Sequence, residues 1–223
     1  MKKFAFLAAP ALLTLAVSAA AAPAYNAGLV TDYLFRGLTQ TDHGVALQGG
    51  ADIKNGNAYG GVWFSNVETP DGSEGLPVEM DVYFGYNNQF SKFNLDMEVL
   101  TYNYLNDSIG DETEFKIGST LAKGLDVNLY RGVKGKTWFP EVTYEMFLPE
   151  RLYLDVSAGL WIQDDADDEG LTARAELGRD FPELHGIDLY VGASYISDDT
   201  PFGDNNDQDD SDLRFFAGVR KNF

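Results

Sequence analysis

The amino-acid sequence predicts an all-β fold: one antiparallel transmembrane β-barrel of about 12 strands, with short periplasmic turns and longer acidic extracellular loops. Three observations carry this prediction. Apolar and polar residues alternate with a period of two, the alternating segments are long for strands, and the links between them are alternately short and long. Together these observations favour a barrel whose outer face contacts lipid.

The alternation is clearest in residues 78–86. Every second residue from Val78 to Tyr86 is apolar, and the residues between them include Glu79 and Asp81. The same pattern recurs over 152–162 and 171–177. Successive side chains of a strand point to opposite faces, so each segment is predicted to be a strand with one apolar face.

Segment length separates a membrane barrel from a soluble sheet. A tilted transmembrane strand needs about 9–11 residues, whereas strands of soluble sheets average about five or six. Most of the predicted strands have the greater length; they cover 27–36, 44–54, 57–66, 78–87, 92–104, 113–121, 125–133, 137–148, 151–162, 170–180, 187–197 and 211–223.

The links alternate in length along the chain. Every second link is mostly tight, as at Asn55-Gly56 and Pro149-Glu150, and Asn-Gly is a strong hairpin signal. The remaining links are mostly longer and polar, as at 37–43 and 198–210, with Gly135-Lys136 as the exception. This alternation is typical of an outer-membrane barrel with both termini in the periplasm.

Some residues need special places in such a barrel. Pro140 falls within a predicted strand and cannot donate to a ladder, so we expect a bulge there or a later strand start. Arg131 and Lys221 fall on the lipid face near strand ends, where a basic side chain costs about 0–1 kcal/mol. Aromatic residues near strand ends are expected to anchor the barrel at the membrane interfaces; they are Phe35, Tyr86, Phe93, Trp138, Tyr195 and Phe223.

The beginning of the chain has the layout of a cleaved signal peptide. Lys2 and Lys3 precede an apolar run over 4–17, and small residues follow up to Ala22. A membrane-spanning or buried core helix is the alternative, but the run is shorter than the roughly 20 residues that a bilayer requires. We therefore predict a signal peptide over 1–22 and a single barrel domain over 23–223.

The composition excludes several classes of protein. The chain has 35 acidic and 16 basic residues, a net charge of −19, so it cannot be a general nucleic-acid binder. It has no Cys, which favours a fold that needs no disulfides in an oxidising compartment. Its hydrophobic content of 44% excludes a disordered chain. The charge permits binding or passage of cations.

The first third of the mature chain resembles a known family. The segments 32–42 (DYLFRGLTQTD), 46–50 (ALQGG), 59–67 (YGGVWFSNV) and 79–86 (EMDVYFGY) are similar to signatures of the TorF-type porins, also known as the Gcw family of conserved bacterial outer-membrane proteins. Further along the chain the likeness rests on strand pattern. The resemblance implies an outer-membrane barrel labelled a porin, and it supplies no catalytic motif and implies no cofactor.

If the apolar face contacts lipid, the other face lines a lumen. The residues predicted to line the pore are Asp52, Glu79, Asp81, Asp96, Glu98, Glu114, Asp155, Arg174, Glu176 and Arg214. Lys54, Lys116, Asp126, Glu141, Glu145, Asp188 and Arg220 share this face. Acids outnumber bases, which favours cations in a pore. The arginines are expected to form the opposite side of a transverse field. The alternative is that acids and bases pair and plug a narrow barrel.

Two predicted loops are strongly acidic. The segments 164–169 and 198–212 are rich in Asp and contain no Lys or Arg. They could be solvated charge runs, or they could bind divalent cations that bridge to lipopolysaccharide. Asp165, Asp167 and Glu169 are weak metal candidates. With Glu176 they have the spacing of a calcium loop, but flanking strands and an inward Glu176 make this match coincidental.

An enzyme and a structural barrel are the rival functions. A lipid hydrolase needs a Ser activated by a His, but His43 and His185 fall at opposite ends of the barrel. Ser65 or Ser197 could approach His43 only by loop folding. An anchoring or adhesive barrel is not excluded. The sequence favours a non-enzymatic channel for passive diffusion of small solutes, with cations preferred.

Overall fold

The computed structural model describes residues 22–68, 77–91, 93–105, 111–164, 169–198 and 211–223. The predicted signal peptide therefore lies outside the described residues, apart from Ala22. Most of the acidic residues of the two predicted loops also lie outside them, including Asp165 and Asp167. In the described part of the chain, no helix has the length and hydropathy needed to span a membrane.

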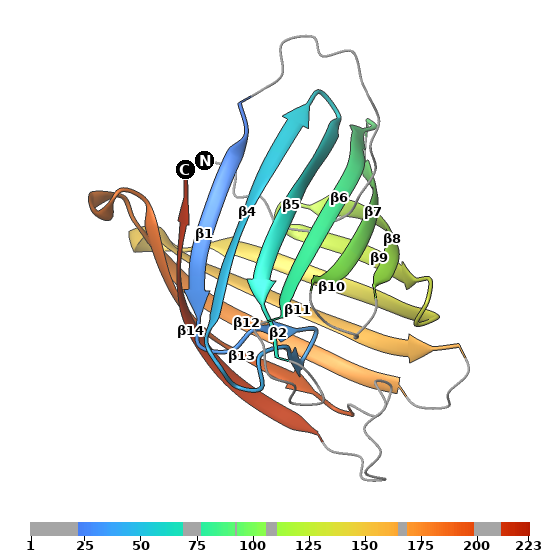
Figure 1. The fold of residues 1–223 in the computed structure, drawn as a ribbon. Helices are drawn as coiled ribbons and strands as arrows, with labels where there is room; N and C mark the ends of the chain where they lie inside the picture. The colour runs from blue at the N-terminus through green and yellow to red at the C-terminus, as the bar shows by residue number, and fades with distance from the viewer. Residues whose placement is uncertain (1–21, 69–76, 92, 106–110, 165–168, 199–210) are drawn as a thin grey trace.

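Twelve strands within the described residues form a closed antiparallel barrel, which confirms the predicted fold (Figure 1). Each strand pairs with the next along the chain, and β1 pairs with β14 to close the ring. The barrel strands are β1 (Ala24–Val30), β4 (Ala46–Asn55), β5 (Ala58–Asn66), β6 (Val78–Gln89), β7 (Asn94–Leu105), β8 (Glu112–Ala122), β9 (Leu125–Gly132), β10 (Thr137–Phe147), β11 (Leu152–Gln163), β12 (Glu169–Phe181), β13 (Ile187–Ile196) and β14 (Asp212–Asn222).

The turns at one end of the barrel are short. Asn55 pairs with Ala58, so the first turn is Gly56 and Asn57, one residue later than the sequence suggests. Two short 3₁₀ turns, η1 (Pro149–Arg151) and η2 (Pro182–Leu184), form the links after β10 and β12. The start of β1 and the end of β14 lie at the same end, where the Phe223 N–H donates to the Tyr25 carbonyl at 2.8 Å.

The outer face is apolar and the inner face is polar, the reverse of a water-soluble protein. On β8, Phe115 and Ile117 are each 50% exposed, whereas Glu114 and Lys116 are 3% and 9% exposed. Exposing this much apolar area to water is unfavourable, so the outer face needs an apolar surrounding. Period-two alternation therefore places the charged side chains in the interior.

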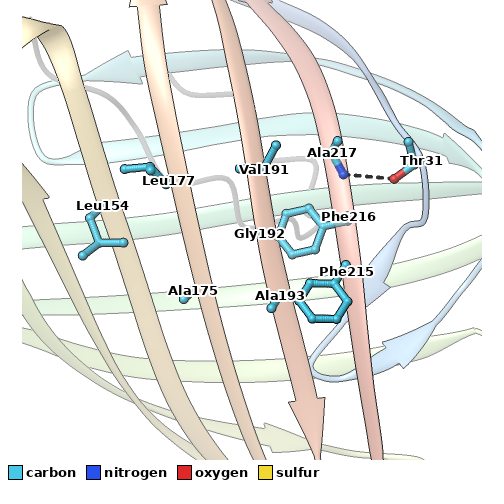
Figure 2. Close-up of a pocket in the computed structure, with 10 residues that line it drawn as sticks. All are labelled: Thr31, Leu154, Ala175, Leu177, Val191, Gly192, Ala193, Phe215, Phe216 and Ala217. Atoms are coloured by element: carbon cyan, nitrogen blue, oxygen red, sulfur yellow. Dashed lines mark hydrogen bonds between the residues drawn. The ribbon is translucent and has the colours of Figure 1, made fainter.

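The outer face has an open apolar groove of about 570 Å³ across β11 to β14 (Figure 2). Small side chains, among them Ala175 and Ala193, form part of its lining, and larger residues such as Leu177 and Val191 flank them. None of its lining residues is titratable. The groove therefore extends the apolar surface and offers no group for chemistry.

The segment between β1 and β4 folds into the barrel, where a loop at 37–43 had been expected to point outward. It contains β2 (Leu34–Phe35) paired with β3 (Leu38–Thr39). Arg36 and Gly37 form the turn with φ values of 48° and 96°, a conformation that two-residue hairpins favour. We call residues 33–40 the inner hairpin.

Two predictions at this place are wrong. The first strand ends at Val30, not at residue 36, because Leu34 and Phe35 pack in the interior clusters and leave the wall of the barrel. Phe35 therefore does not anchor a membrane interface. Its ring lies 5.6 Å from Tyr102 of β7 and 6.2 Å from Trp161 of β11, two strands that stand well apart in the ring.

Pro140 causes no bulge. The register between β10 and β11 is unchanged on its two sides, and the ladder is interrupted only at Phe139 and Pro140. Pairing with β9 is continuous through Pro140. The missing proline N–H thus removes pairing on one side without inserting a residue. The register shift in the sheet lies instead between Thr120 and Ala122.

The base at Arg131 is accommodated by its neighbours at the loop end of β9. Its guanidinium donates to Asp164 at 2.9 and 2.5 Å and lies 4.8 Å from the Trp138 ring centre. These hydrogen bonds hold the pKa of Asp164 below its ordinary value. Lys221 likewise lies over the Phe223 ring, at 5.0 Å. Both bases therefore have partners near strand ends.

Aromatic rings inside the barrel lie flat against glycines on neighbouring strands. A Cβ at Gly178 would lie 2.0 Å from Cζ of Tyr153, so the ring occupies the space that a side chain would fill. The other such pairs are Tyr59 with Gly85, Tyr83 with Gly61, Phe139 with Gly159, Tyr190 with Gly218 and Phe216 with Gly192. Each ring therefore lines the wall and takes little of the bore.

We expect Gly178→Ala to destabilise the barrel by about 1–3 kcal/mol, because the new methyl group forces the Tyr153 ring off the wall. Chemical unfolding of the protein in lipid vesicles measures this change. In a Tyr153→Leu background the same substitution should cost much less. An equal cost in both backgrounds would show that ring contact is not the cause.

Candidate functional site

The candidate site is the barrel interior at the level of the inner hairpin. Figure 1 shows β2 at the end of the barrel toward which β1 runs. The hairpin carries one base, Arg36, between Phe35 and Gly37 at its tip. Because the Arg36–Gly37 turn is tight, this base projects from the most inward point of the segment.

Arg36 forms a two-point ion pair with Glu114 of β8. Its Nη1 and Nη2 atoms donate to Oε1 and Oε2 at 2.7 and 2.8 Å. The side chains are only 7% and 4% exposed. Tyr102 also donates to Glu114 Oε2, at 2.9 Å. A buried pair of this geometry holds both charges only while both partners are present.

Aromatic rings surround the Arg36 guanidinium. Its central carbon lies 4.3 Å from the ring centre of Phe139, 4.4 Å from that of Tyr130 and 4.9 Å from that of Trp161. The Trp161 indole N–H donates to the Arg36 carbonyl at 3.1 Å. Cation–π contacts out of water contribute up to about 2 kcal/mol each. The rings and Glu114 together fix the hairpin tip.

The inner hairpin joins three apolar clusters inside the barrel. Leu34 packs with Val30 and Tyr190, and Leu38 packs in the cluster that contains Ile196. Phe35 contacts two of the clusters, one on β6 and β7 and one that includes residues of β9 to β11. The hairpin therefore spans the lumen at this level and narrows any passage through it.

One side of the interior is acidic. We define the acidic wall as five of the six carboxylates of β6 to β8, without Glu112 at the loop end: Glu79, Asp81, Asp96, Glu98 and Glu114. Lys116 Nζ donates to Asp96 at 2.9 Å. The Tyr59 hydroxyl lies 2.9 Å from both Asp96 and Glu98. Arg36, which pairs with Glu114, and Lys116 together offset only part of the negative charge of the acidic wall.

The opposite side carries arginines. Arg174 of β12 donates to Glu176 at 3.0 Å, and Arg220 of β14 contacts the same carboxylate. Arg220 also donates to Tyr153 at 2.7 Å and lies 3.7 Å from Asp188. We call Arg174, Arg214 and Arg220 the arginine side. Their side chains are 24–34% exposed, more than Arg36.

The two charged sides face each other across the barrel. In the closed strand order β7 is the fifth strand and β13 the eleventh, so five strands separate them on either side. The acidic wall is centred on β7, and the arginine side flanks β13. Acidic and basic side chains on opposite sides of the interior are the arrangement that produces an electric field across the barrel.

The other predicted pore residues are spread around the ring. Asp52 lies on β4, and Asp155 on β11 stands directly across from Glu145 of β10. Arg214 contacts Asp212 and His43 at the loop end. Among the described residues, the predicted pore residues therefore form several separate groups and do not converge on one site.

Among the residues that the structure describes, no serine lies in hydrogen-bonding contact with either histidine. His43 Nδ1 lies 3.2 Å from Asp32, and its Nε2 lies 2.6 Å from Arg214. Ser65 and Ser197 bond to other groups: the Ser65 hydroxyl donates to the Asn66 carbonyl, and Ser197 accepts from the Leu171 N–H. His185 lies in the turn after η2 at the opposite end. The described part of the chain therefore does not pair Ser65 or Ser197 with a histidine.

The calcium-like spacing does not form a site in the described part of the chain. Glu176 points inward onto Arg174 and Arg220, whereas Glu169 is exposed at the start of β12. No group of three or more metal-binding side chains is found among the described residues. Asp165 and Asp167 lie outside those residues.

Comparison with protein families decides the affiliation. A model described as "Bacterial protein of unknown function (Gcw_chp)" matches residues 16–201. The chain belongs to the Gcw_chp family. The match confirms the Gcw resemblance, and the TorF-type assignment of this Gcw_chp protein stays a prediction. No curated protein matches the sequence.

Solved structures of porins are similar to this Gcw_chp protein in fold. The KdgM porin in complex with disordered oligogalacturonate has a TM-score of 0.57 at 11% identity, over 90% of this chain and 98% of the other. The KdgM porin alone has 0.57 at 10%, over 90% and 99%. The Acinetobacter baumannii outer membrane protein Omp33 has 0.56 at 10%, over 89% and 96%. At these identities the likeness is one of fold.

We expect Glu114→Gln to release the inner hairpin, because Arg36 keeps a buried charge without its partner, at a cost of about 3–5 kcal/mol. Limited proteolysis within 33–40 and Trp161 fluorescence report the release. The double variant Arg36→Met/Glu114→Gln should restore protection, since Met keeps the packing without the charge. Equal protection in wild type and Glu114→Gln would contradict this role.

Proposed function

We propose that this protein is an outer-membrane channel for passive diffusion of small solutes, with a preference for cations. The supporting observation is the acidic wall, a set of carboxylates enclosed in a barrel whose outer face is apolar. Carboxylates that line a pore lower the energy of cations and raise that of anions. The porin-like fold is the expected scaffold for this function.

The inner hairpin sets the width of the proposed passage. It joins the wall at β8 through Arg36 and at β9 to β11 through aromatic contacts. Arg36, the base of the inner hairpin, is paired with Glu114. Its positive charge is therefore not available to offset the other carboxylates of the acidic wall. Cations would therefore pass beside Asp81 and Glu98, under a field directed from the arginine side.

The solute differs in charge from the one named with KdgM. Oligogalacturonate is a chain of carboxylated sugars, and its presence is stated for the KdgM porin. In this chain, a net charge of −19 and the acidic wall oppose entry of a polyanion. We therefore propose small cationic and neutral solutes.

The proposed location is the outer membrane, with the acidic loops outward. Asp164, Asp198 and Asp212 lie at the loop end of β11, β13 and β14. Carboxylates there can share divalent cations with anionic lipopolysaccharide headgroups. This partner, like the signal peptide, is part of the proposal.

A non-conducting structural barrel is the second candidate. The observation in its favour is that Phe35 of the inner hairpin reaches both Tyr102 and Trp161 across the lumen. A hairpin fixed in this place could seal the bore. The barrel would then anchor the envelope or present its loops.

Single-channel recording in planar bilayers distinguishes the two candidates. We expect discrete current steps with a cation-selective reversal potential across a KCl gradient. Glu98→Gln should move that potential toward zero by roughly half, because one luminal acid of a small group is lost. Glu150→Gln, in the exposed η1 turn, is the matched control and should change nothing. An inserted but silent barrel would support the structural candidate.

Replacement of residues 34–39 by a short Gly-Ser linker should widen the passage. We expect single-channel conductance to rise about threefold or more, since the bore of a twelve-stranded barrel is then limited by its wall. The same recording measures this change. Unaltered conductance would mean that solutes bypass the hairpin.

A further inference from the structure

Two carboxyl groups lie side by side in the acidic wall where the inner hairpin meets β6. Glu79 and Asp81 occupy successive inward positions of that strand. They are 2% and 5% exposed, among the most enclosed charged residues of the barrel. Their positions place them near Tyr33, the first residue of the hairpin.

Oxygen groups converge on this pair. The hydroxyls of Tyr33 and of Tyr104 on β7 and the Asp81 carboxyl group all lie within hydrogen-bonding reach of the Glu79 carboxyl group. The Tyr33 ring is held edge-on against Trp63 of β5, with ring centres 5.3 Å apart. Residues of the hairpin and of three strands thus enclose one set of oxygen donors.

The pair is incompletely satisfied by the protein. Glu79 Oε2 and Asp81 Oδ1 are buried and have no hydrogen-bond partner among the described residues. The nearby bases are engaged elsewhere, Arg36 by Glu114 and Lys116 by Asp96. Two adjacent buried carboxylates are costly unless a positive charge joins them. The site therefore calls for a cation or a shared proton.

We propose that Glu79 and Asp81, with the hydroxyls of Tyr33 and Tyr104, bind a hard divalent cation of the Ca²⁺ class. An all-oxygen donor set with two carboxylates suits such an ion in charge and in chemistry. The inference deepens the proposed function and rests on it for its role: the site is a binding step for cations on the acidic wall. It also couples the cation to the inner hairpin through Tyr33.

Terbium luminescence tests the site without a membrane. Tb³⁺ replaces Ca²⁺ at oxygen sites, and Tyr33, Tyr104 and Trp63 are placed to sensitise it. In the folded protein in detergent we expect sensitised emission that Ca²⁺ displaces. Glu79→Gln/Asp81→Asn should lower the affinity at least about tenfold. Asp188→Asn, an inward acid on the arginine side, is the matched control and should leave the affinity unchanged.

Each result decides the proposal. Equal emission in the wild type and the double variant would overturn the proposed cation site, and so would a lack of emission in the wild type at neutral pH. Either result would indicate that Glu79 and Asp81 share a proton. Circular dichroism verifies folding, and Asp81→Asn alone replaces the double variant if that one does not fold. Binding in a barrel that is silent in bilayers would keep the site and refute the channel, whereas conduction without binding would do the opposite.

Discussion

The guanidinium of Arg36 and the carboxylate of Glu114 meet inside the barrel, each more than nine-tenths buried. Neither charge is tolerable there alone, so the pair holds the hairpin and the wall in one arrangement. The rings of Tyr130, Phe139 and Trp161 surround the guanidinium. This ion pair therefore fixes the position of the inner hairpin relative to the barrel wall.

The remainder of the interior is organised by charge and by small residues. Acids gather on β6 to β8 and arginines on β12 and β14, while rings such as Tyr153 lie flat over glycines. The flat rings leave space that upright side chains would occupy. Most carboxylates of the acidic wall are nevertheless enclosed by their neighbours, as at Glu79 and Glu98, which are 2% and 4% exposed. In the proposed channel, the inner hairpin would narrow the passage at the level of Arg36.

Most of the barrel could be predicted from residue patterns, because period-two alternation depends only on which face meets lipid. The strands from β4 to β14 follow it closely, and Pro140 disturbs pairing less than expected. The inner hairpin could not be predicted in the same way, since Tyr33, Leu34 and Phe35 are residue types that suit a lipid-facing strand as well as the interior. One signal was present: Arg36 followed by Gly37 is a base at a tight turn between apolar residues. Its partner, Glu114, is 78 residues distant, and only the closed ring brings the two together.

The closure of the ring by β1 and β14 has a consequence for the order of assembly. The first strand finds its second neighbour only when the last strand is made, since Asn26 pairs with Asn222. Contacts between such distant segments form late, because the entropy of a long chain must be lost first. The inner hairpin needs β8 and β11 before it has a place to dock. The segment synthesised among the earliest is therefore one of the last to reach its native contacts, and until then its apolar side chains depend on whatever accompanies the chain to the membrane.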